Sequence, residues 1–419
     1  MKRFIVPLVT AVMVVSIIFA GCMPGAPVTP PPVTPPPVTP PPVTPPPVTP
    51  PEEKVLKVAQ LQPLSGPGAG YGGPAKIGYT FAAEDINAAG GIKVGDEYYR
   101  LEIVEYDTKF DPAVSATVAR RAIYEEGVKY MVLHGGGPEA AAILPIVEEE
   151  NVVLFALTDD SGYVGTEHPS AFYIFMYAPD SAALQYEYIA NTYPDATRVV
   201  GTFPDTASGY ELADIWAETV PEFGFEVVDA IFLPTDTIDF YPVLTPLLGQ
   251  DVDIIEQAGF PGGTSGLMIV QARELGWEGM FTEFTGGEFE DRAIAADGWE
   301  ALEGMLGTGY PGVPVTAFGE AFYERCQGVL DDPPVWLGYF YDQMFLLKLA
   351  IEEADSIEQA AVMQALEEVT FSGVLGEELH FAGEEVVGLN RLLAHLYVVT
   401  QIVDGAPVAV HQAMPLWAR

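Results

Sequence analysis

Cysteine, histidine and basic residues are scarce in this sequence, and each scarcity excludes a class of protein. Two cysteines, Cys22 and Cys326, allow at most one disulfide, which excludes a small scaffold held together by disulfides. Five histidines without an H-E-x-x-H motif argue against a zinc hydrolase, and we expect neither a metal nor a cofactor. The 18 Lys and Arg residues face 59 Asp and Glu residues, a formal net charge of −41. Such a chain lacks the basic face that nucleic acid or anionic lipid requires.

The acidic residues have two interpretations, a solvated surface, which we favour, and an acidic patch for a specific partner. Hydrophobic residues make up 49% of the 419 residues, which is ample for packed cores and suits two or three domains. The 38 prolines are concentrated near the start of the chain, so they do not argue for disorder throughout.

The first 22 residues have the pattern of an export signal. A basic start at residues 1–3 precedes a mainly apolar stretch over 4–20. A membrane helix is the alternative, but a proline-rich segment follows instead of a positive flank. Ala20-Gly21-Cys22 resembles the lipobox of bacterial lipoproteins, although Phe19 stands where Leu, Val or Ile is usual. The resemblance implies a signal peptide over 1–21 and a diacylglycerol on the Cys22 sulfur. Cys326 then has no disulfide partner, and we expect a buried, inert thiol.

Residues 22–54 are predicted to form a lipidated start and a linker. Val-Thr-Pro-Pro-Pro recurs in steps of five from Val28. Prolines favour polyproline II at roughly 3.1 Å per residue, so this spacer spans up to about 85 Å. A ligand for an SH3-type domain is the alternative interpretation, but an exported segment would have no such domain nearby to bind it.

From residue 55 onward, strand and helix patterns alternate. The first run has strands at 55–59, 101–106, 130–133 and 152–157, with helices near 74–88, 111–126 and 138–149. A second run, after residues 176–180, has strands at 198–202, 226–233, 253–255 and 279–281, with helices near 208–222, 241–249 and 263–275. This rhythm predicts an α/β fold with two lobes, each a mainly parallel sheet covered on both faces.

Ligands of such sheets bind beyond the carboxyl ends of the strands. The loops concerned follow Val58, Leu133, Leu157, Thr202, Ile255 and Phe281. A further helical pattern over 336–351 carries Trp336, Tyr339 and Tyr341, which we expect to be mostly core with one ring reaching the cleft.

Two glycine-rich motifs follow strands. Residues 68–73 satisfy G-x-G-x-x-G, but Asp107, the acid that ends the second strand, lies more than thirty residues beyond Gly73, whereas a dinucleotide site has it about 20 residues on. A loop that makes room for another ligand is therefore favoured. Residues 134–137 (HGGG) resemble the oxyanion loop of lipases, but we find no Gly-x-Ser-x-Gly elbow, which argues against an esterase.

A third set of motifs is specific as a combination. It comprises PLSGP at 63–67, Tyr71-Gly72, AEDINAAGGI at 83–92, Tyr106-Asp107 with Asp111-Pro112, and QARELG at 271–276. In this order and spacing the set resembles the branched-chain amino-acid-binding family of extracytoplasmic solute receptors for ABC transporters. The resemblance extends from residue 55 to the C-terminus and is best in the first lobe.

This resemblance implies the type I periplasmic-binding fold, in which two Rossmann-like lobes are joined by three crossovers and close on a small ligand. Lobe 1 would take residues 55–178 and 310–391, and lobe 2 would take 179–309 and 392–419. The partners implied are a small-molecule ligand, a membrane ABC permease and, through the lipid, the membrane. We expect a monomer that is not an enzyme. A sensory module of the same fold is the alternative, and an exported esterase a weaker one.

The family's binding positions carry over only in part. Tyr71 matches a tyrosine that forms an aromatic wall, and Thr158 falls in the segment that grips ammonium and carboxylate. The acid that pairs with the ammonium aligns near Thr285, with Glu283 and Glu288 close on either side. The residues that we predict to bind the ligand are Ser65, Tyr71, His134, Gly136, Gly137, Thr158, Asp159, Asp160, Ser208, Tyr210, Phe260 and Glu283.

Several of these positions depart from the family pattern. Gly137 stands where a serine usually donates to the ligand carboxylate, and Asp160 replaces a threonine. Ser208 occupies an aromatic position, although Tyr210 is close, and Phe260 replaces a tyrosine. Structural roles are the alternatives at some of them. Tyr71 would pack its own loop, Asp159 and Asp160 would cap a helix, Phe260 would be core, and His134 a satisfied histidine at a strand end.

These departures bear on the ligand. A missing hydroxyl at Gly137 weakens carboxylate recognition unless N–H groups at the next helix start compensate. Asp160 would repel a carboxylate but favour an amine or hydroxyl donor. No Lys or Arg lies in these loops. The sequence therefore favours an uncharged or amine-bearing molecule with an apolar part, such as an amino-acid-related amine or amide, with a branched-chain amino acid as the alternative.

Overall fold

The computed structural model describes residues 54–418 except 67, 159–160, 287–288, 310–313, 331–332 and 335, and it leaves out the side chains of residues 70, 71, 161 and 309. The predicted signal peptide, Cys22 and almost all of the linker lie outside the described residues, as do Asp159 and Asp160. Within the described part of the chain, no helix has both the length and the apolar character needed to cross a membrane.

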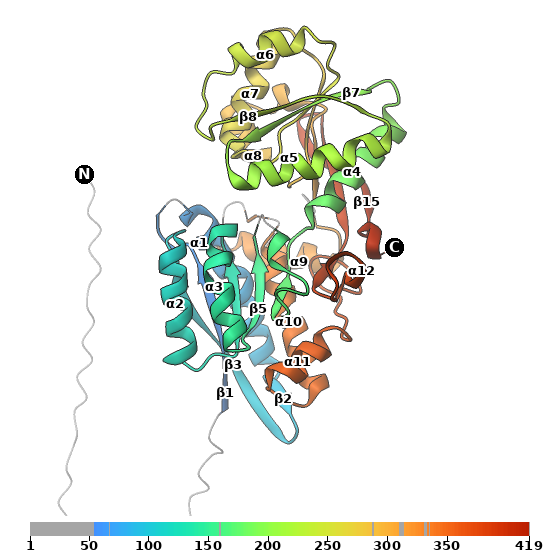
Figure 1. The fold of residues 1–419 in the computed structure, drawn as a ribbon. Helices are drawn as coiled ribbons and strands as arrows, with labels where there is room; N and C mark the ends of the chain where they lie inside the picture. Colours follow the sequence, from blue (N-terminus) through green and yellow to red (C-terminus); the bar gives the residue numbers. More distant parts are fainter. Residues whose placement is uncertain are drawn as a thin grey trace, which may run out of the picture. The chain divides into compact units, whose positions relative to one another are not determined.

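The first sheet has eight strands in the order β12-β13-β6-β5-β4-β1-β3-β2. Figure 1 labels β1, β2, β3 and β5 of this sheet. Its strands are β1 (Lys54–Gln62), β2 (Ile92–Val94), β3 (Glu97–Asp107), β4 (Tyr130–His134), β5 (Val153–Leu157), β6 (Ala171–Tyr173), β12 (His380–Ala382) and β13 (Leu392–Ala394). All neighbours are parallel except β2 with β3 and β12 with β13. The central strands β4 and β5 are buried along their whole length, which explains their continuous apolar sequences.

Helices cover both faces of this sheet. Helices α2 (Pro112–Tyr124) and α3 (Gly137–Glu149) lie side by side (Figure 1) and pack against one face. Helices α1 (Ala69–Ala88) and α10 (Leu337–Ala354) pack on the other face. The remaining elements are α9 (Ala317–Gln327), α11 (Gln359–Leu366), α12 (Glu384–Val387) and the short 3₁₀ turn η1 (Ser161–Tyr163).

The second sheet has seven strands in the order β15-β14-β11-β10-β9-β7-β8. They are β7 (Arg198–Pro204), β8 (Glu226–Leu233), β9 (Ile254–Glu256), β10 (Met280–Glu283), β11 (Leu306–Gly309), β14 (Tyr397–Val403) and β15 (Ala406–Ala413). Helices α4 (Ala178–Thr192) and α5 (Ala207–Thr219) contribute to the core on one face. Helices α6 (Tyr241–Leu248), α7 (Gly262–Glu274) and α8 (Phe289–Ala295) contribute to the core on the other. Three 3₁₀ turns complete this part: η2 (Val220–Phe223), η3 (Glu300–Leu302) and η4 (Leu416–Ala418).

The chain passes between the two sheets three times, after β6, after β11 and after β13. The predicted α/β fold with two mainly parallel sheets is therefore confirmed. One boundary differs from the prediction. The sequence placed residue 392 in the second lobe, whereas β13 pairs with β6 and β12 in the first sheet. A three-residue strand has no sequence signature of its own, because partners distant in the chain decide its pairing.

Local sequence signals account for the helix starts. Asp111 accepts hydrogen bonds from the backbone N–H groups of Ala113 (2.8 Å) and Val114 (2.9 Å), and Pro112 occupies the first turn. Thr206 caps α5 in the same way by accepting from Gly209 N–H at 3.1 Å. Such caps satisfy backbone donors that the helix itself leaves unpaired.

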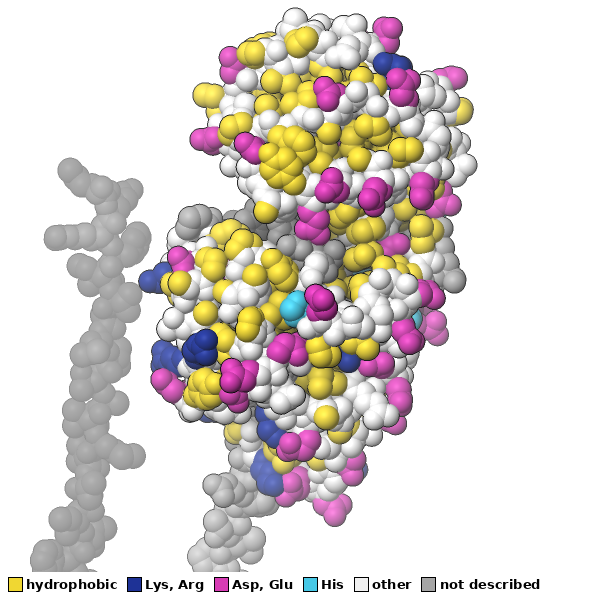
Figure 2. All heavy atoms as spheres, in the orientation of Figure 1, with side chains coloured by type: hydrophobic (Ala, Val, Ile, Leu, Met, Phe, Trp, Pro, Cys, Tyr) yellow, Lys and Arg dark blue, Asp and Glu magenta, His cyan; other side chains and the backbone are white. Residues whose placement is uncertain are grey.

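The state of Cys326 and the distribution of acidic side chains were both predicted from the sequence. Cys326 is a buried free cysteine, as predicted, and burial raises the pKa of its thiol to about 12. Acidic side chains are spread over both lobes on the face drawn in Figure 2, with basic side chains between some of them. That distribution agrees with a solvated acidic surface.

Candidate functional site

A cavity of about 280 Å³ is lined by residues of both lobes. First-lobe residues come from the ends of β1, β3, β4, β5 and β6 or the loops that follow them, and from the residue before α10. Second-lobe residues come from α5, from the loop after β9, from the end of β10 and the loop after it, and from α8. The described lining residues are Pro63, Phe110, His134, Gly135, Gly136, Leu157, Thr158, Tyr173, Phe175, Met176, Ala178, Ser208, Leu212, Gly259, Phe260, Pro261, Glu283, Thr285, Gly286, Arg292 and Trp336. These are mainly the carboxyl ends of strands, where the sequence placed the ligand.

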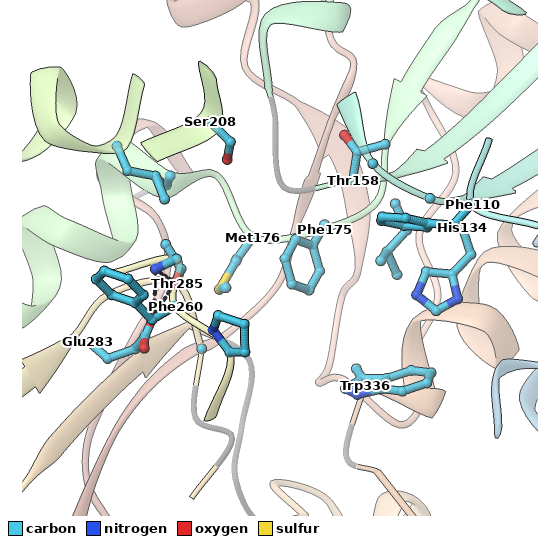
Figure 3. A pocket seen from close by; sticks show the side chains of 18 of the residues that line it. Phe110, His134, Thr158, Phe175, Met176, Ser208, Phe260, Glu283, Thr285 and Trp336 are labelled. Atoms are coloured by element: carbon cyan, nitrogen blue, oxygen red, sulfur yellow. Dashed lines mark hydrogen bonds between the residues drawn. The ribbon is translucent and has the colours of Figure 1, made fainter. Parts of the chain in front are cut away.

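Aromatic rings dominate the first-lobe side. Figure 3 shows Phe110, His134 and Trp336 on one side of the cavity, Phe260, Glu283 and Thr285 on the other, and Phe175 between them. The His134 ring lies 5.3 Å from the Trp336 ring, centroid to centroid. Burial lowers the pKa of His134 to about 3, so this imidazole is neutral at physiological pH. The first-lobe side therefore offers ring surfaces, and its histidine adds no charge.

Phe110 is held in an unusual backbone conformation. Lys109 and Phe110 have φ angles of 57° and 58°, in the left-handed region that costs a non-glycine residue on the order of 1 kcal/mol or more. Side chains hold this turn. Lys109 N–H donates to Asp107 Oδ1 at 2.9 Å, and Phe110 N–H donates to Thr108 Oγ1 at 3.3 Å. The turn leaves the Phe110 side chain in the cavity wall with the residue 46% exposed.

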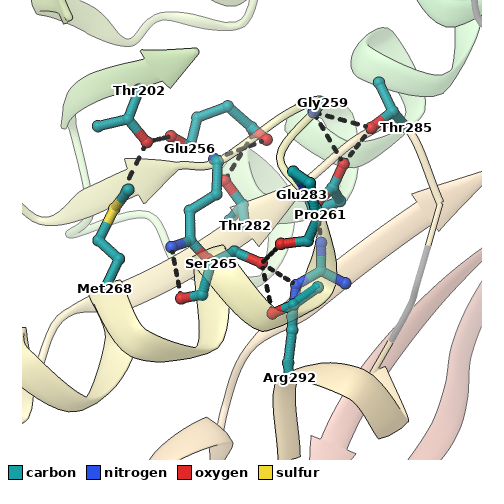
Figure 4. A network of polar contacts seen from close by, with 12 residues as sticks. Thr202, Glu256, Gly259, Pro261, Ser265, Met268, Thr282, Glu283, Thr285 and Arg292 are labelled. Atoms are coloured by element: carbon teal, nitrogen blue, oxygen red, sulfur yellow. Dashed lines mark hydrogen bonds and ion pairs between the residues drawn. The ribbon is translucent and has the colours of Figure 1, made fainter. Parts of the chain in front are cut away.

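A charged pair forms the second-lobe side. Arg292 on α8 donates through Nη2 to Glu283 Oε2 at the end of β10, and the two side chains are 1% and 4% exposed. Thr285 Oγ1 donates to Glu283 Oε1, and Gly259 N–H lies 3.4 Å from the same oxygen (Figure 4). Arg292 Nε donates to Ser265 Oγ at 2.9 Å. Glu283 is thus already neutralised and hydrogen-bonded within the protein.

A second glutamate lies buried in the same polar network. Glu256 Oε2 accepts hydrogen bonds from Gln185 Nε2 (2.8 Å), Tyr186 OH (3.1 Å) and Thr282 Oγ1 (2.7 Å). Burial, together with the negative charge of Glu283, raises the pKa of Glu256 to about 7. The network therefore joins the cavity wall to α4, the helix that follows the first crossover.

The structure brings about half of the predicted binding residues together. His134, Gly136, Thr158, Ser208, Phe260 and Glu283 line the cavity. Three described residues do not line it. Ser65 Oγ donates to Asp107 Oδ2 at 2.5 Å, Gly137 begins α3, and Tyr210 donates to Asp205 Oδ1 at 2.8 Å while its ring stacks on Phe232. The side chain of Tyr71, like Asp159 and Asp160, is outside the described part.

Sequence reasoning missed Phe110, Phe175, Met176, Thr285 as a lining residue, and Arg292. The sequence has no Lys or Arg in the predicted binding loops, but Arg292 reaches the cavity from helix α8. One signal was available for it, since Arg292 is the first basic residue after Glu283. No comparable signal marked Phe110, whose orientation depends on the left-handed turn.

Packing explains the two glycine-rich motifs. A Cβ on Gly72 would lie 2.2 Å from the carbonyl oxygen of Pro63, and one on Gly68 would lie 3.0 Å from Cδ2 of Phe110. A Cβ on Gly135 would lie 2.5 Å from Glu139 Oε2, the oxygen that accepts from Gly136 N–H at 3.0 Å. These glycines allow close approach of the loops that border the cavity.

Comparison with known proteins gives the class. Residues 55–406 match the family model described as periplasmic binding protein, so this chain belongs to that family. The Leucine-, isoleucine-, valine-, threonine-, and alanine-binding protein of Pseudomonas aeruginosa is 26% identical over 324 residues, which are 77% of this chain and 84% of that protein. The resemblance to branched-chain amino-acid-binding receptors of ABC transporters is thereby confirmed, and the named relatives are binding proteins rather than enzymes.

Solved structures share the fold. The branched-chain amino acid transporter substrate binding protein of Streptococcus pneumoniae, in complex with isoleucine, has a TM-score of 0.70 at 21% identity, covering 86% of this chain and 100% of that one. A solute binding protein from Rhodopseudomonas palustris, in complex with benzoate, has a TM-score of 0.68 at 17% identity, covering 86% and 97%. The same fold therefore accommodates an aliphatic amino acid in one relative and an aromatic acid in another.

Proposed function

We propose that this protein is the extracytoplasmic receptor of an ABC transporter. It binds one small solute between its lobes as a monomer and delivers the solute, chemically unchanged, to a membrane permease. The observation that carries this proposal is the cavity, whose lining comes from both lobes and from Phe175 and Met176 at the first crossover.

Binding at such a place is coupled to closure. A solute that contacts both lobes binds more tightly where the lobes approach each other, so it shifts the equilibrium toward the closed form. The crossover residues Phe175 and Met176 lie between the two walls of the cavity in Figure 3, which puts the solute next to the segment about which the lobes would rotate. The permease would then recognise the closed form.

The N-terminal sequence supports the same role. An export signal, a lipid-bearing Cys22 and a proline-rich spacer would keep the receptor outside the cytoplasm and attached to the membrane that contains its permease. A spacer of up to about 85 Å leaves the folded part free to reach that permease.

The test is to identify what the protein carries. Mass spectrometry of small molecules released by mild denaturation, followed by thermal-shift screening of amino acids, amides, amines and aromatic acids, should find one solute with a Kd in the micromolar range or below. At 100 times Kd that solute would stabilise the folded form by about 2.7 kcal/mol. Conversion of the solute into a product, or labelling by a serine-directed fluorophosphonate, would overturn the proposal.

A further inference from the structure

The two sides of the cavity differ in chemistry. The first-lobe side presents the rings of Phe110, His134 and Trp336, with Phe175 between the two sides. The second-lobe side presents the Glu283–Arg292 pair and Thr285. A solute that fits both sides needs a flat apolar part at one end and a small polar part at the other.

The first-lobe side is shaped for a ring. Aromatic faces and edges carry opposite partial charges, so ring walls favour an aromatic guest in stacked or edge-to-face contact over an aliphatic side chain of similar volume. The His134 and Trp336 rings, with centroids 5.3 Å apart and planes inclined by 56°, supply two differently oriented surfaces.

The Phe110 ring is already positioned in the cavity wall by contacts within the protein. Its ring approaches the loop glycines, since a Cβ on Gly136 would lie 3.4 Å from Cζ of Phe110. The residue nevertheless stays 46% exposed and follows a left-handed turn that hydrogen bonds to Asp107 and Thr108 hold in place. Strained backbone that places an exposed ring in a cavity wall is typical of a ligand-binding position.

Among the described residues of the second-lobe side, one acid is paired with one cation, and one buried donor has no hydrogen-bond partner. Glu283 already accepts from Arg292, Thr285 and Gly259, so both of its carboxylate oxygens have hydrogen-bond partners within the protein. Buried Arg292 Nη1 has no hydrogen-bond partner among the described residues. A buried guanidinium N–H is costly to leave unpaired, so a solute acceptor near Arg292 would be strongly favoured.

We propose that the solute is a monocyclic aromatic molecule without net charge, whose ring lies against Phe110 and Trp336 and whose carbonyl or amide oxygen accepts from Arg292. This inference rests on the proposed function and assigns its ligand class. A cavity of about 280 Å³ is close to the lower limit of roughly 300–1,000 Å³ for ligand pockets, which agrees with one ring and a short substituent.

Calorimetric titration of the purified full chain with matched probes tests the proposal. Benzamide should bind at least tenfold more tightly than isobutyramide, which lacks the ring, and more tightly than benzoate and benzylamine, which carry charge. Leucine binding as tightly as benzamide would overturn the inference, as would a preference for benzoate or benzylamine.

Two variants test whether the Phe110 ring contributes to binding. Phe110→Leu should weaken benzamide binding at least tenfold, and Phe318→Leu, at a 45% exposed ring outside the cavity lining, should leave it unchanged. Unchanged binding by Phe110→Leu would count against the ring wall. If an aliphatic solute co-purifies, only the ligand class fails; if no solute of any class binds or co-purifies, the receptor function fails with it.

Discussion

Arg292 donates to Glu283 inside the cavity wall, and both side chains are almost completely buried. In the sequence comparison, Glu283 stood near the position of the acid that pairs with a ligand ammonium. In the structure, Glu283 instead pairs with Arg292 of the same chain, nine residues further on. The second lobe thus differs from a simple ammonium site, and the pair links α8 to the end of β10.

Removal of Arg292 should be strongly destabilising. Arg292→Met leaves the Glu283 carboxylate buried without its cation, and breaking a buried pair in this way costs roughly 3–5 kcal/mol. Urea denaturation followed by circular dichroism measures the loss. The matched control is Arg121→Met, because Arg121 is 60% exposed and pairs with Glu125 on the surface, where such pairs contribute at most about 1 kcal/mol. Similar losses in the two variants would contradict the burial of the Glu283–Arg292 pair.

Glu256 should make stability depend on pH. Its folded-state pKa of about 7 lies above the ordinary value of 4.5, so the folded protein holds this proton more tightly than the unfolded chain. Its contribution to stability is therefore complete below pH 4.5 and is lost as the pH rises to about 7, by about 3 kcal/mol.

The variant Glu256→Gln isolates this effect, because other buried groups titrate in the same interval. Burial lowers the pKa of His395 from 6.5 to about 4. Because the unfolded chain then binds this proton more tightly, His395 makes the free energy of unfolding rise with pH between about 4 and 6.5. The free energy of unfolding of Glu256→Gln, minus that of the parent protein, should rise between pH 4.5 and pH 7 and stay constant above. A difference that does not change with pH would show that Glu256 is not buried as described.

Adjacent glycines in α1 should respond oppositely to alanine. Gly72→Ala places a Cβ 2.2 Å from the Pro63 carbonyl oxygen, so backbone has to move, at a cost of about 1–3 kcal/mol. Gly73→Ala meets nothing within 4 Å and should stabilise the helix by up to about 1 kcal/mol. Thermal denaturation of both variants gives the comparison, and a destabilising Gly73→Ala would contradict the packing of this loop.

Lipid attachment should depend on Cys22 alone. Cys22→Ser should abolish incorporation of radiolabelled palmitate and release the protein from the membrane fraction. Cys326→Ala, at the buried free thiol, should still incorporate palmitate and remain in the membrane fraction. Retention of label by Cys22→Ser would show that the lipobox resemblance is misleading.

Much of the fold could be predicted from local pattern. The continuous apolar run at β4 and the Asp111-Pro112 helix start each depend on neighbours in sequence. The three-residue strand β13 could not be assigned, because its membership of the first sheet depends on pairing with β6, more than 200 residues earlier. His134 and Phe260 stood in predicted loops, yet nothing in the sequence showed which of their atoms would face the cavity.

The amino-acid sequence by itself determined the alternation of strands and helices, the division into two runs and the family, because periodicity, caps and motifs are properties of consecutive residues. Only the tertiary structure decided that Arg292 meets Glu283 and that Phe110 joins His134 and Trp336 in one wall. Those contacts join elements that are separate in the chain, and the orientation of Phe110 depends on a left-handed turn. Their geometry therefore exists only once both sheets have formed.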